Sequence, residues 1–400
     1  MLKYKEKNLG QIFTPSHIVE KMVGLIRYGK NILEPAVGNG KFLKQLKNYK
    51  NITSIEIDRS FAFDIIPENL PSIIFSDFFD YSIKNKFDTI IGNPPYVKYS
   101  NIIPETRKKL KKFNVLFDGR TNLFLYFIYK SYLHLKEKGE IIFIIPRELF
   151  DLTSALRLNQ LLHENGTFTH IYTFGDKKIF GNGFSPNVMI FRYEKGNMSH
   201  ETIYNDEKRY QYCSKGFIYF IKEKNYSMHL SDIAYVKVGG VSGADEVFAH
   251  ESGNIEVVCS YTQKTGKTKR MIYNTINDHL LKHKEKLLKR KIKKFDENNW
   301  WKWGRDFYIS DNPRIYVNAK TRNKKPFFIH ESKYYDGSIL GIFPKNQNID
   351  LVELRNMLND LNWEELGFIC DGRYIFTQKK LENVILPEAF QKFIYNNKII

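Results

Sequence analysis

"ILEPAVGNGKFL", residues 32–43, has the pattern of a buried strand that passes through a tight turn into a helix. Gly38 and Gly40 allow the backbone to turn sharply and to approach a ligand closely, and helical spacing begins at Lys41. The glycines depart from the GxGxxG spacing and no P-loop lysine follows them, which argues against a dinucleotide or a nucleoside triphosphate. The stretch therefore predicts a strand-end site for a different class of ligand.

Outward from this turn, the N-terminal half of the chain alternates apolar, β-branched runs with stretches of helical spacing, such as residues 16–27 and 122–136. The runs are typical of buried strands that end in a polar or glycine turn: "ITSIEID", "SIIFSDFF", "FDTIIGNPPY", "GEIIFIIPREL" and "THIYTFG". This alternation predicts a doubly wound α/β fold with a parallel sheet, whose ligands lie at the carboxyl ends of the strands.

The chain is long enough for two domains, and its rhythm changes after about residue 224. We expect a first domain at residues 1–226 and a smaller, mixed α+β domain at 227–400. Hydrophobic residues make up 42% and charged residues 26%, which is typical of a globular protein.

The composition also bears on location and metal binding. No apolar run approaches the ~18 residues of a membrane span, and the N-terminus lacks the apolar core of a signal peptide, so we expect a cytoplasmic protein with no membrane partner. Cys213, Cys259 and Cys370 are scattered, without a ligand spacing, so neither a disulfide framework nor a metal site is expected.

Positive charge is concentrated in one segment. The net charge is +18, and residues 264–325 hold 19 Lys and Arg against 6 Asp and Glu. Trp300, Trp301 and Trp303 are interleaved with these basic residues. Lysines and arginines neutralise phosphates, and aromatic rings can stack on bases, so the segment favours a nucleic-acid surface. The alternative is a solvated basic face around a core cluster of aromatic residues.

Two acids follow the next predicted strands. Glu56 ends the strand in "SIEID", where a carboxylate can accept both hydroxyls of a ribose. Asp77 ends the strand in "FSDFFD", where it can accept from an adenine amino group beside the ring of Phe78. A glycine turn, a ribose acid and an adenine acid together describe a nucleoside ligand without phosphate, and S-adenosylmethionine fits this description. The alternative is that these acids cap the helices that follow.

The tetrapeptide Asn93-Pro94-Pro95-Tyr96 closes the fourth strand. The side-chain oxygen of Asn93 and the carbonyl of Pro94 are two acceptors for an exocyclic amine, which they would make more nucleophilic. The consecutive prolines Pro94 and Pro95 fix the direction of that carbonyl. Tyr96 then offers a ring face for a planar base. The alternative is a β-turn with a buried tyrosine.

In their order along the chain, these motifs resemble a known family, the γ-class N6-adenine DNA methyltransferases, which are the TaqI-like methylases of restriction-modification systems. The segments that resemble its motifs X, I, II, III and IV are "GQIFTP" (10–15), "EPAVGNG" (34–40), "EID" (56–58), "SDF" (76–78) and "NPPY" (93–96). "VKVGGVSGADEVF" (236–248) looks like the opening of the family's target-recognition domain. The resemblance covers most of residues 9–194 and then thins.

The resemblance also implies further site residues. It would place the methionine end of the cofactor against Thr14, Pro15, Glu34, Ala36 and Gly38. An aromatic residue ahead of "NVMIFRY" would pack on the second face of the base; Phe180 is the best match and Phe184 the fallback. The basic stretch at 97–120 would either clamp phosphates near the flipped nucleotide or be a solvated surface loop.

The function implied by the resemblance is an adenine-specific, site-specific DNA methyltransferase. A Rossmann-like catalytic domain would transfer a methyl group from S-adenosyl-L-methionine to N6 of an adenine flipped out of double-stranded DNA. The transfer would be direct, without a covalent intermediate. The protein would be a monomer, the modification enzyme of a type II restriction-modification system with a separately encoded endonuclease, at the nucleoid of a prokaryotic cell.

Other functions stay open. The tetrapeptide also occurs in methyltransferases that act on protein glutamine N5 and on RNA adenine N6. The basic segment 264–325 counts against a protein substrate but does not separate DNA from RNA. A nucleic-acid-binding protein with an inert methyltransferase-like domain is a further alternative, and the intact tetrapeptide and cofactor acids argue against it.

Overall fold

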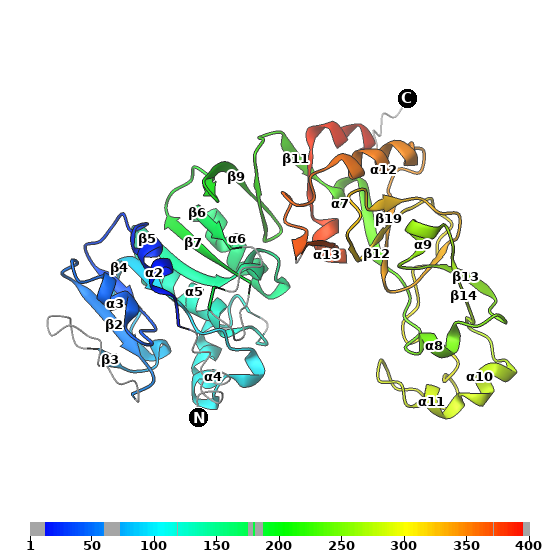
Figure 1. Ribbon diagram of the computed structural model, residues 1–400, viewed down its shortest axis with the longest axis horizontal. Coiled ribbons are helices and arrows are strands. Elements are labelled where there is room, and N and C mark those ends of the chain that lie inside the picture. Colours follow the sequence, from blue (N-terminus) through cyan, green and yellow to red (C-terminus); the bar gives the residue numbers. More distant parts are fainter. Residues whose placement is uncertain are drawn as a thin grey trace. The chain divides into compact units, whose positions relative to one another are not determined.

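The computed structural model describes residues 13–59, 73–117, 119–174, 179–180, 187–370 and 372–394. The chain divides into two compact units, residues 1–224 and 225–400 (Figure 1). This division lies two residues before the boundary that the sequence suggests, between 226 and 227. The first unit contains all the cofactor and catalytic positions predicted from the sequence.

One mixed sheet organises the first unit. Among the described residues its ten strands have the order β10-β9-β8-β6-β7-β5-β4-β1-β2-β3. The neighbours from β5 to β3 in this order are parallel, whereas β7 runs antiparallel between β5 and β6. The strand bounds are β1 Ile32–Glu34, β2 Ile52–Glu56, β3 Ile74–Phe75, β4 Phe87–Gly92, β5 Leu135–Pro146, β6 Gly166–Thr173, β7 Val188–Lys195, β8 Glu201–Tyr204, β9 Glu207–Ser214 and β10 Phe217–Ile221.

Helices pack against both faces of this sheet. Because successive strand residues point to opposite faces, β4 places Ile90 in a core cluster with α5 and Ile91 in a second cluster with α2 and α3. Ile141 and Ile142 of β5 divide in the same way. The helices are α2 Ser16–Val23, α3 Lys41–Gln45, α4 Pro104–Leu110, α5 Leu123–His134 and α6 Leu156–Glu164. A sheet covered on both faces confirms the predicted doubly wound α/β, Rossmann-like fold. The expectation of a parallel sheet holds only from β5 to β3, because β7 and the hairpin strands β8, β9 and β10 add antiparallel pairs.

The quoted stretch at residues 32–43 forms the strand, turn and helix that its sequence predicts. Gly38 has a φ of 58° and Gly40 a φ of 74°, a left-handed conformation in which a Cβ atom would be strained. β1 lies between β2 and β4, so the strand order reverses beside the turn. Such a reversal opens a crevice at the carboxyl ends of the strands, where ligands of these sheets bind.

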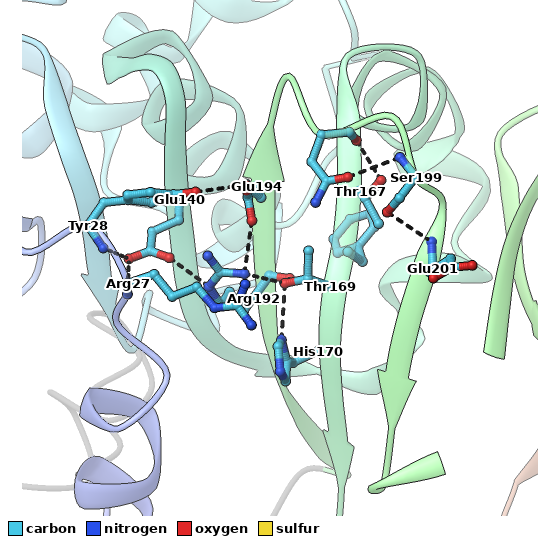
Figure 2. Close-up of polar contacts among 12 residues, drawn as sticks. Arg27, Tyr28, Glu140, Thr167, Thr169, His170, Arg192, Glu194, Ser199 and Glu201 are labelled. Atoms are coloured by element: carbon cyan, nitrogen blue, oxygen red, sulfur yellow. Dashed lines mark hydrogen bonds and ion pairs between the residues drawn. The ribbon is translucent and has the colours of Figure 1, made fainter. Parts of the chain in front are cut away.

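An ionic network lies inside the same sheet, away from those carboxyl ends (Figure 2). Arg192 of β7 and Glu140 of β5 are fully buried, and their Nε and Oε2 atoms are 2.6 Å apart. Glu140 Oε1 also accepts from the backbone N–H groups of Arg27 (2.9 Å) and Tyr28 (3.1 Å) and from Thr89 Oγ1 (2.7 Å). The network therefore ties the loop after α2 to three strands, and it gives a buried negative charge four donors.

The second unit is a mixed α+β assembly of small sheets, as predicted. Among its described residues the sheets have the orders β12-β19-β15-β17, β14-β13-β18, β16-β21-β20 and β11-β22. The strands are β11 Tyr226–His229, β12 Ala234–Val238, β13 Ile255–Val258, β14 Lys269–Met271, β15 Ile315–Asn318, β16 Lys320–Thr321, β17 Phe327–Phe328, β18 Tyr334–Tyr335, β19 Ile339–Pro344, β20 Ile369–Cys370, β21 Arg373–Ile375 and β22 Ile385–Pro387. The helices are α7 Leu230–Ile233, α8 Asp245–Phe248, α9 Thr262–Thr265, α10 Asp278–Lys282, α11 Lys284–Leu288, α12 Leu351–Asp360 and α13 Gln378–Glu382.

The aromatic residues interleaved with the basic segment mostly belong to the core of this unit. Trp300, Trp303 and Phe307 are buried, and Trp303 Nε1 donates to the carbonyl of Ile272 at 3.0 Å. Trp300 and Trp303 therefore cannot stack on bases, and the expectation is wrong for these two residues, whereas Trp301 is only partly buried. Tyr308, in contrast, is exposed.

Across the described ranges, no helix is long and apolar enough to span a membrane.

Candidate active site

A cavity lies at the carboxyl ends of the parallel strands of the first unit. Its wall contains eight of the residues predicted from the sequence, namely Thr14, Ala36, Gly38, Glu56, Asp77, Phe78, Asn93 and Pro95. They come from segments that extend in the chain from Thr14 to Pro95, and the strand order brings them together. The predicted residues Pro15, Glu34, Pro94, Tyr96 and Phe180 do not line this cavity.

Glu56, the last residue of β2, is held by the backbone of the cavity wall. Its Oε2 accepts from the N–H of Gly38 and its Oε1 from the N–H of Asp58, both at 2.8 Å. Burial raises the pKa of Glu56, and the backbone hydrogen bonds partly oppose this shift. Each carboxylate oxygen retains a second acceptor position, so the pair can receive two hydroxyl donors, as a ribose offers.

Glu34, the last residue of β1, is a buried acid of a different kind. It is fully buried, and neither carboxylate oxygen has a hydrogen-bond partner in the part of the chain that the structure describes. Burial, and secondarily the charge of Glu56, raises the pKa of Glu34 well above its usual value. Its side chain packs beside the end of β4, because a Cβ atom at Gly92 would be 4.0 Å from Glu34 Cγ. A carboxyl group in this state suits a ligand that brings a cation or several donors.

Phe78 forms an aromatic wall of the cavity. The residue is buried, and its ring centroid is 5.1 Å from that of Phe127 of α5. The buried ammonium of Lys130 is 4.7 Å from the centre of the Phe78 ring, and it donates to the carbonyls of Phe78 and Tyr81. Burial lowers the pKa of Lys130 to about 8. This lysine fixes the turn that carries Phe78, a role that its place inside an apolar helical stretch did not reveal.

The tetrapeptide 93–96 follows β4 directly and is anchored at both ends. Asn93 Nδ2 donates to Oγ1 of the buried Thr14 at 3.1 Å, which directs the amide oxygen away from Thr14. The Tyr96 hydroxyl donates to the carbonyl of Ile144 in β5 at 2.8 Å. Burial of this hydroxyl raises the pKa of Tyr96 well above its usual value. The amide is thus held by Thr14, ahead of α2, and the ring by β5.

Phe180 lies against the core cluster that contains α2 and α3, where Tyr96 also packs, and not on the cavity wall. Its alternative, Phe184, and residues 10–12 of the N-terminal motif lie outside the described residues. The second base-stacking residue therefore stays a prediction.

The cavity wall also contains residues from two segments to which the sequence assigned no cofactor role. Ile102, Ile103 and Thr106 come from the stretch after the tetrapeptide, and Leu123 and Phe127 come from α5. Their position in the chain, soon after residues 93–96, was the one sequence feature that could have indicated this role. In the first segment, the many basic residues made the apolar residues Ile102 and Ile103 less conspicuous.

Known proteins similar in sequence to this chain are methyltransferases of restriction-modification systems. Residues 29–180 match the model of the Eco57I restriction-modification methylase family. The type II methyltransferase M.HincII of Haemophilus influenzae is 42% identical over 213 residues, which cover 51% of this chain and 41% of that protein. M.TthHB8I of Thermus thermophilus is 30% identical over 203 residues, which cover 48% and 46% respectively. The matched part thus spans less than half the length of these relatives.

The structure of the type IIL restriction-modification enzyme MmeI in complex with DNA is similar to both units. It has a TM-score of 0.62 at 14% sequence identity, and the match covers 96% of this chain and 69% of that one. At this identity the similarity concerns the fold.

Proposed function

We propose that this chain, in which residues 29–180 belong to the Eco57I restriction-modification methylase family, is a DNA methyltransferase that modifies N6 of an adenine. The substrate is double-stranded DNA, from which the target adenine is flipped into the site. The protein is the modification enzyme of a type II restriction-modification system, and a separately encoded endonuclease is its functional partner. It acts as a monomer in the cytoplasm, on the DNA of the nucleoid.

The position of Asn93 carries this proposal. Its amide lies on the cavity wall, and the hydrogen bond from Nδ2 to Thr14 Oγ1 fixes the direction in which the amide oxygen points. This oxygen and the Pro94 carbonyl accept from the exocyclic amine, which draws the nitrogen lone pair out of conjugation with the ring. Positive charge develops on that nitrogen as it is alkylated, and the two oxygens stabilise it without reorganisation. Tyr96 supplies a ring held by the sheet for the flipped base.

S-Adenosyl-L-methionine is the cofactor, and when bound it supplies an electrophilic methyl group on a sulfonium centre. The residues present fit such a group. Glu56 has acceptor positions for the ribose hydroxyls, and Asp77 beside Phe78 accepts from the adenine amine. Thr14, Pro15, Glu34 and the backbone from Ala36 to Gly38 hold the methionine end. The orphaned, buried carboxyl group of Glu34 is the observation that favours a cationic ligand there.

Exposed lysines of the second unit support a DNA substrate. The loop at residues 289–294, after α11, carries four ammonium groups, and none of them forms an ion pair with a carboxylate of the described residues. These are Lys289, Lys291, Lys293 and Lys294. Unpaired cations on a surface loop attract phosphates, and such contacts position a duplex.

The same loop is anchored by a buried arginine. Arg290 is buried, and its guanidinium donates to the carbonyls of Ser242, Trp300 and Lys302. It also lies 3.8 Å from the ring centroid of Phe295. A loop fixed in this way presents its lysines without paying the full entropic cost of ordering them on binding.

The proposal is tested by expressing the protein in a host that lacks adenine methylation and mapping modified bases in its genome by long-read sequencing. N6-methyladenine at one short motif, absent with Asn93→Ala, is the expected result. An unmodified genome, with soluble protein that binds S-adenosylmethionine, would instead favour RNA adenine or protein glutamine as the substrate. Protein that binds no cofactor would favour an inert, nucleic-acid-binding domain.

A further inference from the structure

The glycine-rich stretch at residues 239–243, which follows β12, is packed closely by other parts of the second unit. A Cβ atom at Gly240 would lie 2.8 Å from the ring of Trp303. At Gly243, where φ is 80°, a Cβ atom would lie 2.5 Å from Cδ1 of Ile292. The missing side chains therefore let the basic segment of this unit approach the backbone of the stretch directly.

The same stretch holds Arg305 by its backbone and by its side chain. The N–H of Val241 donates to the carbonyl of Arg305 at 2.8 Å, and the N–H of Arg305 donates to the carbonyl of Val241 at 3.0 Å. The guanidinium Nη2 donates to the carbonyl of Gly239 at 3.1 Å. Trp303 and Phe307, on either side of Arg305 in the chain, are buried. Arg305 is thus presented from a fixed segment, which reduces the conformational entropy that it loses when it binds a ligand.

The surroundings of Arg305 differ from those of three other arginines of the unit. Arg270 is ion-paired, and Arg290 and Arg314 are buried and donate to backbone carbonyls. Arg305 is exposed, and among the described residues its guanidinium has one acceptor, a backbone carbonyl. Because a guanidinium has five N–H donors in a planar fork, most of these donors remain available to a ligand.

The charge next to Arg305 favours the edge of a base over a phosphate. Asp306 is also exposed, and its Oδ1 accepts from the hydroxyl of Tyr273 at 3.2 Å. A carboxylate at this place repels a phosphate, whereas the loop at 289–294 contains no acidic residue. The edge of guanine carries no charge, and its O6 and N7 atoms are two acceptors that match the fork of an arginine.

We propose that Arg305 is a specificity-determining residue that contacts O6 and N7 of a guanine in the major groove of the DNA site, and that the stretch 239–243 holds it in position. This inference rests on the DNA substrate proposed above. The loop at 289–294 contacts phosphates and positions the duplex, whereas Arg305 contributes to the choice of sequence. The methylated motif therefore contains at least one G·C pair.

The test measures base preference. The motif is first identified by genome mapping with wild-type protein, and duplexes are then made in which each G·C pair of the motif is replaced in turn by the other base pairs. The kcat/KM of methyl transfer is measured on each duplex. Wild-type protein is expected to prefer guanine at one position by about 10- to 100-fold, and in Arg305→Ala this preference falls to about threefold or less. Preferences at the other positions are retained.

A duplex with 7-deazaguanine at that position tests the contact itself. This base has a C–H group in place of N7 and keeps O6, so it lacks one of the two acceptors. The kcat/KM of wild-type protein is expected to fall by about 10-fold, the value of one hydrogen bond to a charged group. Arg305→Ala should be insensitive to the replacement. An equal fall in both proteins would mean that another residue contacts N7 and would overturn the proposal.

Controls separate the reading of a base from a phosphate contact or a structural role. Either of these would lower kcat/KM on every duplex by the same factor and leave the base preference unchanged, which overturns the proposal. Arg322→Ala, at another exposed arginine of the unit, should keep the wild-type preference, and its loss there would contradict a specific role of Arg305. If Arg305→Ala does not fold, Arg305→Met, which retains an aliphatic stem, is expected to lose the preference in the same way.

The failure of this inference is distinguishable from the failure of the proposed function. Wild-type protein that methylates no DNA contradicts the proposed function. A wild-type motif that consists of A·T pairs alone, or an unchanged base preference in Arg305→Ala, contradicts the role of Arg305 and leaves the proposed function intact.

Discussion

The sheet of the first unit contains two fully buried glutamates with opposite surroundings. Glu140 in β5 receives four donors and pairs with the buried Arg192 (Figure 2). Glu34 at the end of β1 is as deeply buried, yet its carboxylate has no hydrogen-bond partner among the residues described. Both are strand residues of one sheet, so the difference is one of position along the strands.

We attribute the difference to function: Glu140 is a structural acid, and we propose that Glu34 is reserved for a ligand. A buried charge with a full set of partners specifies the fold, and removing one partner leaves the other uncompensated. A buried carboxyl group with no partner costs free energy in the empty protein, and native proteins retain such groups mainly where they function. Glu34 is the last residue of β1 and directly precedes Pro35 and Ala36, which line the cavity, whereas Glu140 lies within β5.

The largest effect is expected at the cavity edge itself. Asn93→Ala removes an acceptor for the target amine, and we expect methyl transfer to DNA to fall by about 100- to 1,000-fold, as for loss of one fixed dipole at a reacting centre. Cofactor affinity should be largely retained, because the change removes the hydrogen bond from Asn93 to Thr14 but none of the groups assigned to the cofactor. Incorporation of labelled methyl groups and calorimetric titration measure the two quantities. Equal loss of both would contradict the role of Asn93.

Removing the charge of Glu140, the paired acid, should lower stability and leave methyl transfer and cofactor binding unaffected. Glu140→Gln removes one of the two carboxylates that pair with the buried Arg192, and Glu194, at 3.1 Å, remains as the other. We therefore expect the free energy of unfolding to fall by about 3 kcal/mol, the lower end of the cost of breaking a buried ion pair. Urea unfolding followed by circular dichroism measures this change. The remaining folded protein should bind S-adenosylmethionine with wild-type affinity, and an affinity loss at full folding would show that the two ends of the sheet are not independent.

The same substitution at Glu34 should weaken cofactor binding without lowering stability. Glu34→Gln replaces a buried carboxyl group that has no hydrogen-bond partner among the described residues with a neutral amide, so the free energy of unfolding at neutral pH should be unchanged or higher. Affinity for S-adenosylmethionine should fall by about 10- to 100-fold, the value of a hydrogen bond to a charged group. A large loss of stability in this variant would mean that Glu34 is structural.

The pH dependence of stability sharpens the comparison further. The folded protein raises the pKa of Glu34 above its usual value of 4.5, so the stability linked to its proton is fully present below that value. This stability is lost as the pH rises through the higher, folded-state pKa. As the pH is raised from acid to neutral, wild-type protein should therefore lose unfolding free energy relative to Glu34→Gln. Urea titrations at several pH values test this sign.

The smallest effect extends the comparison to paired and unpaired lysines of the second unit. Lys291, Lys293 and Lys294 are exposed, whereas Lys284 and Lys286 pair with Glu297 and Glu246. Changing the first three to Gln should reduce the salt dependence of DNA binding by about 2.7 in log–log slope, which is 0.9 for each lost phosphate contact. Lys284→Gln/Lys286→Gln should change the slope less. Equal changes per lysine would show that the loop at 289–294 has no special role.

Much of the site was predictable because strand ends are local features. Glu34, Glu56, Asp77 and Asn93 each follow an apolar run, and parallel strands bring such ends to one edge. The pairing of Glu140 with Arg192 was not predictable, because it depends on β7 lying antiparallel beside β5. The contribution of residues 97–120 to the cavity was not predictable either, because it depends on which side of α4 faces the sheet. One side of this helix lines the cavity, while the other exposes lysines.

The aromatic residues near 300 show a further limit. Tryptophan among lysines has the same local pattern on a nucleic-acid surface and over a hydrophobic core, and only the packing of α8, β13 and β14 against them distinguishes the two. The choice of Phe180 rested on its distance along the chain from β7. Such a distance does not identify a site residue when the intervening stretch is glycine-rich, because that stretch does not fix the register.

The most direct test of the central claim is the proton count of cofactor binding, measured by calorimetric titration of S-adenosylmethionine in two buffers of different ionisation enthalpy. If Glu34 is held protonated in the empty site and ionises against the cationic end of the cofactor, wild-type protein releases protons on binding at mildly acidic pH. Glu34→Gln should release fewer and bind more weakly. Identical proton release and affinity in the two proteins would contradict the claim that this unpaired acid is reserved for the cofactor.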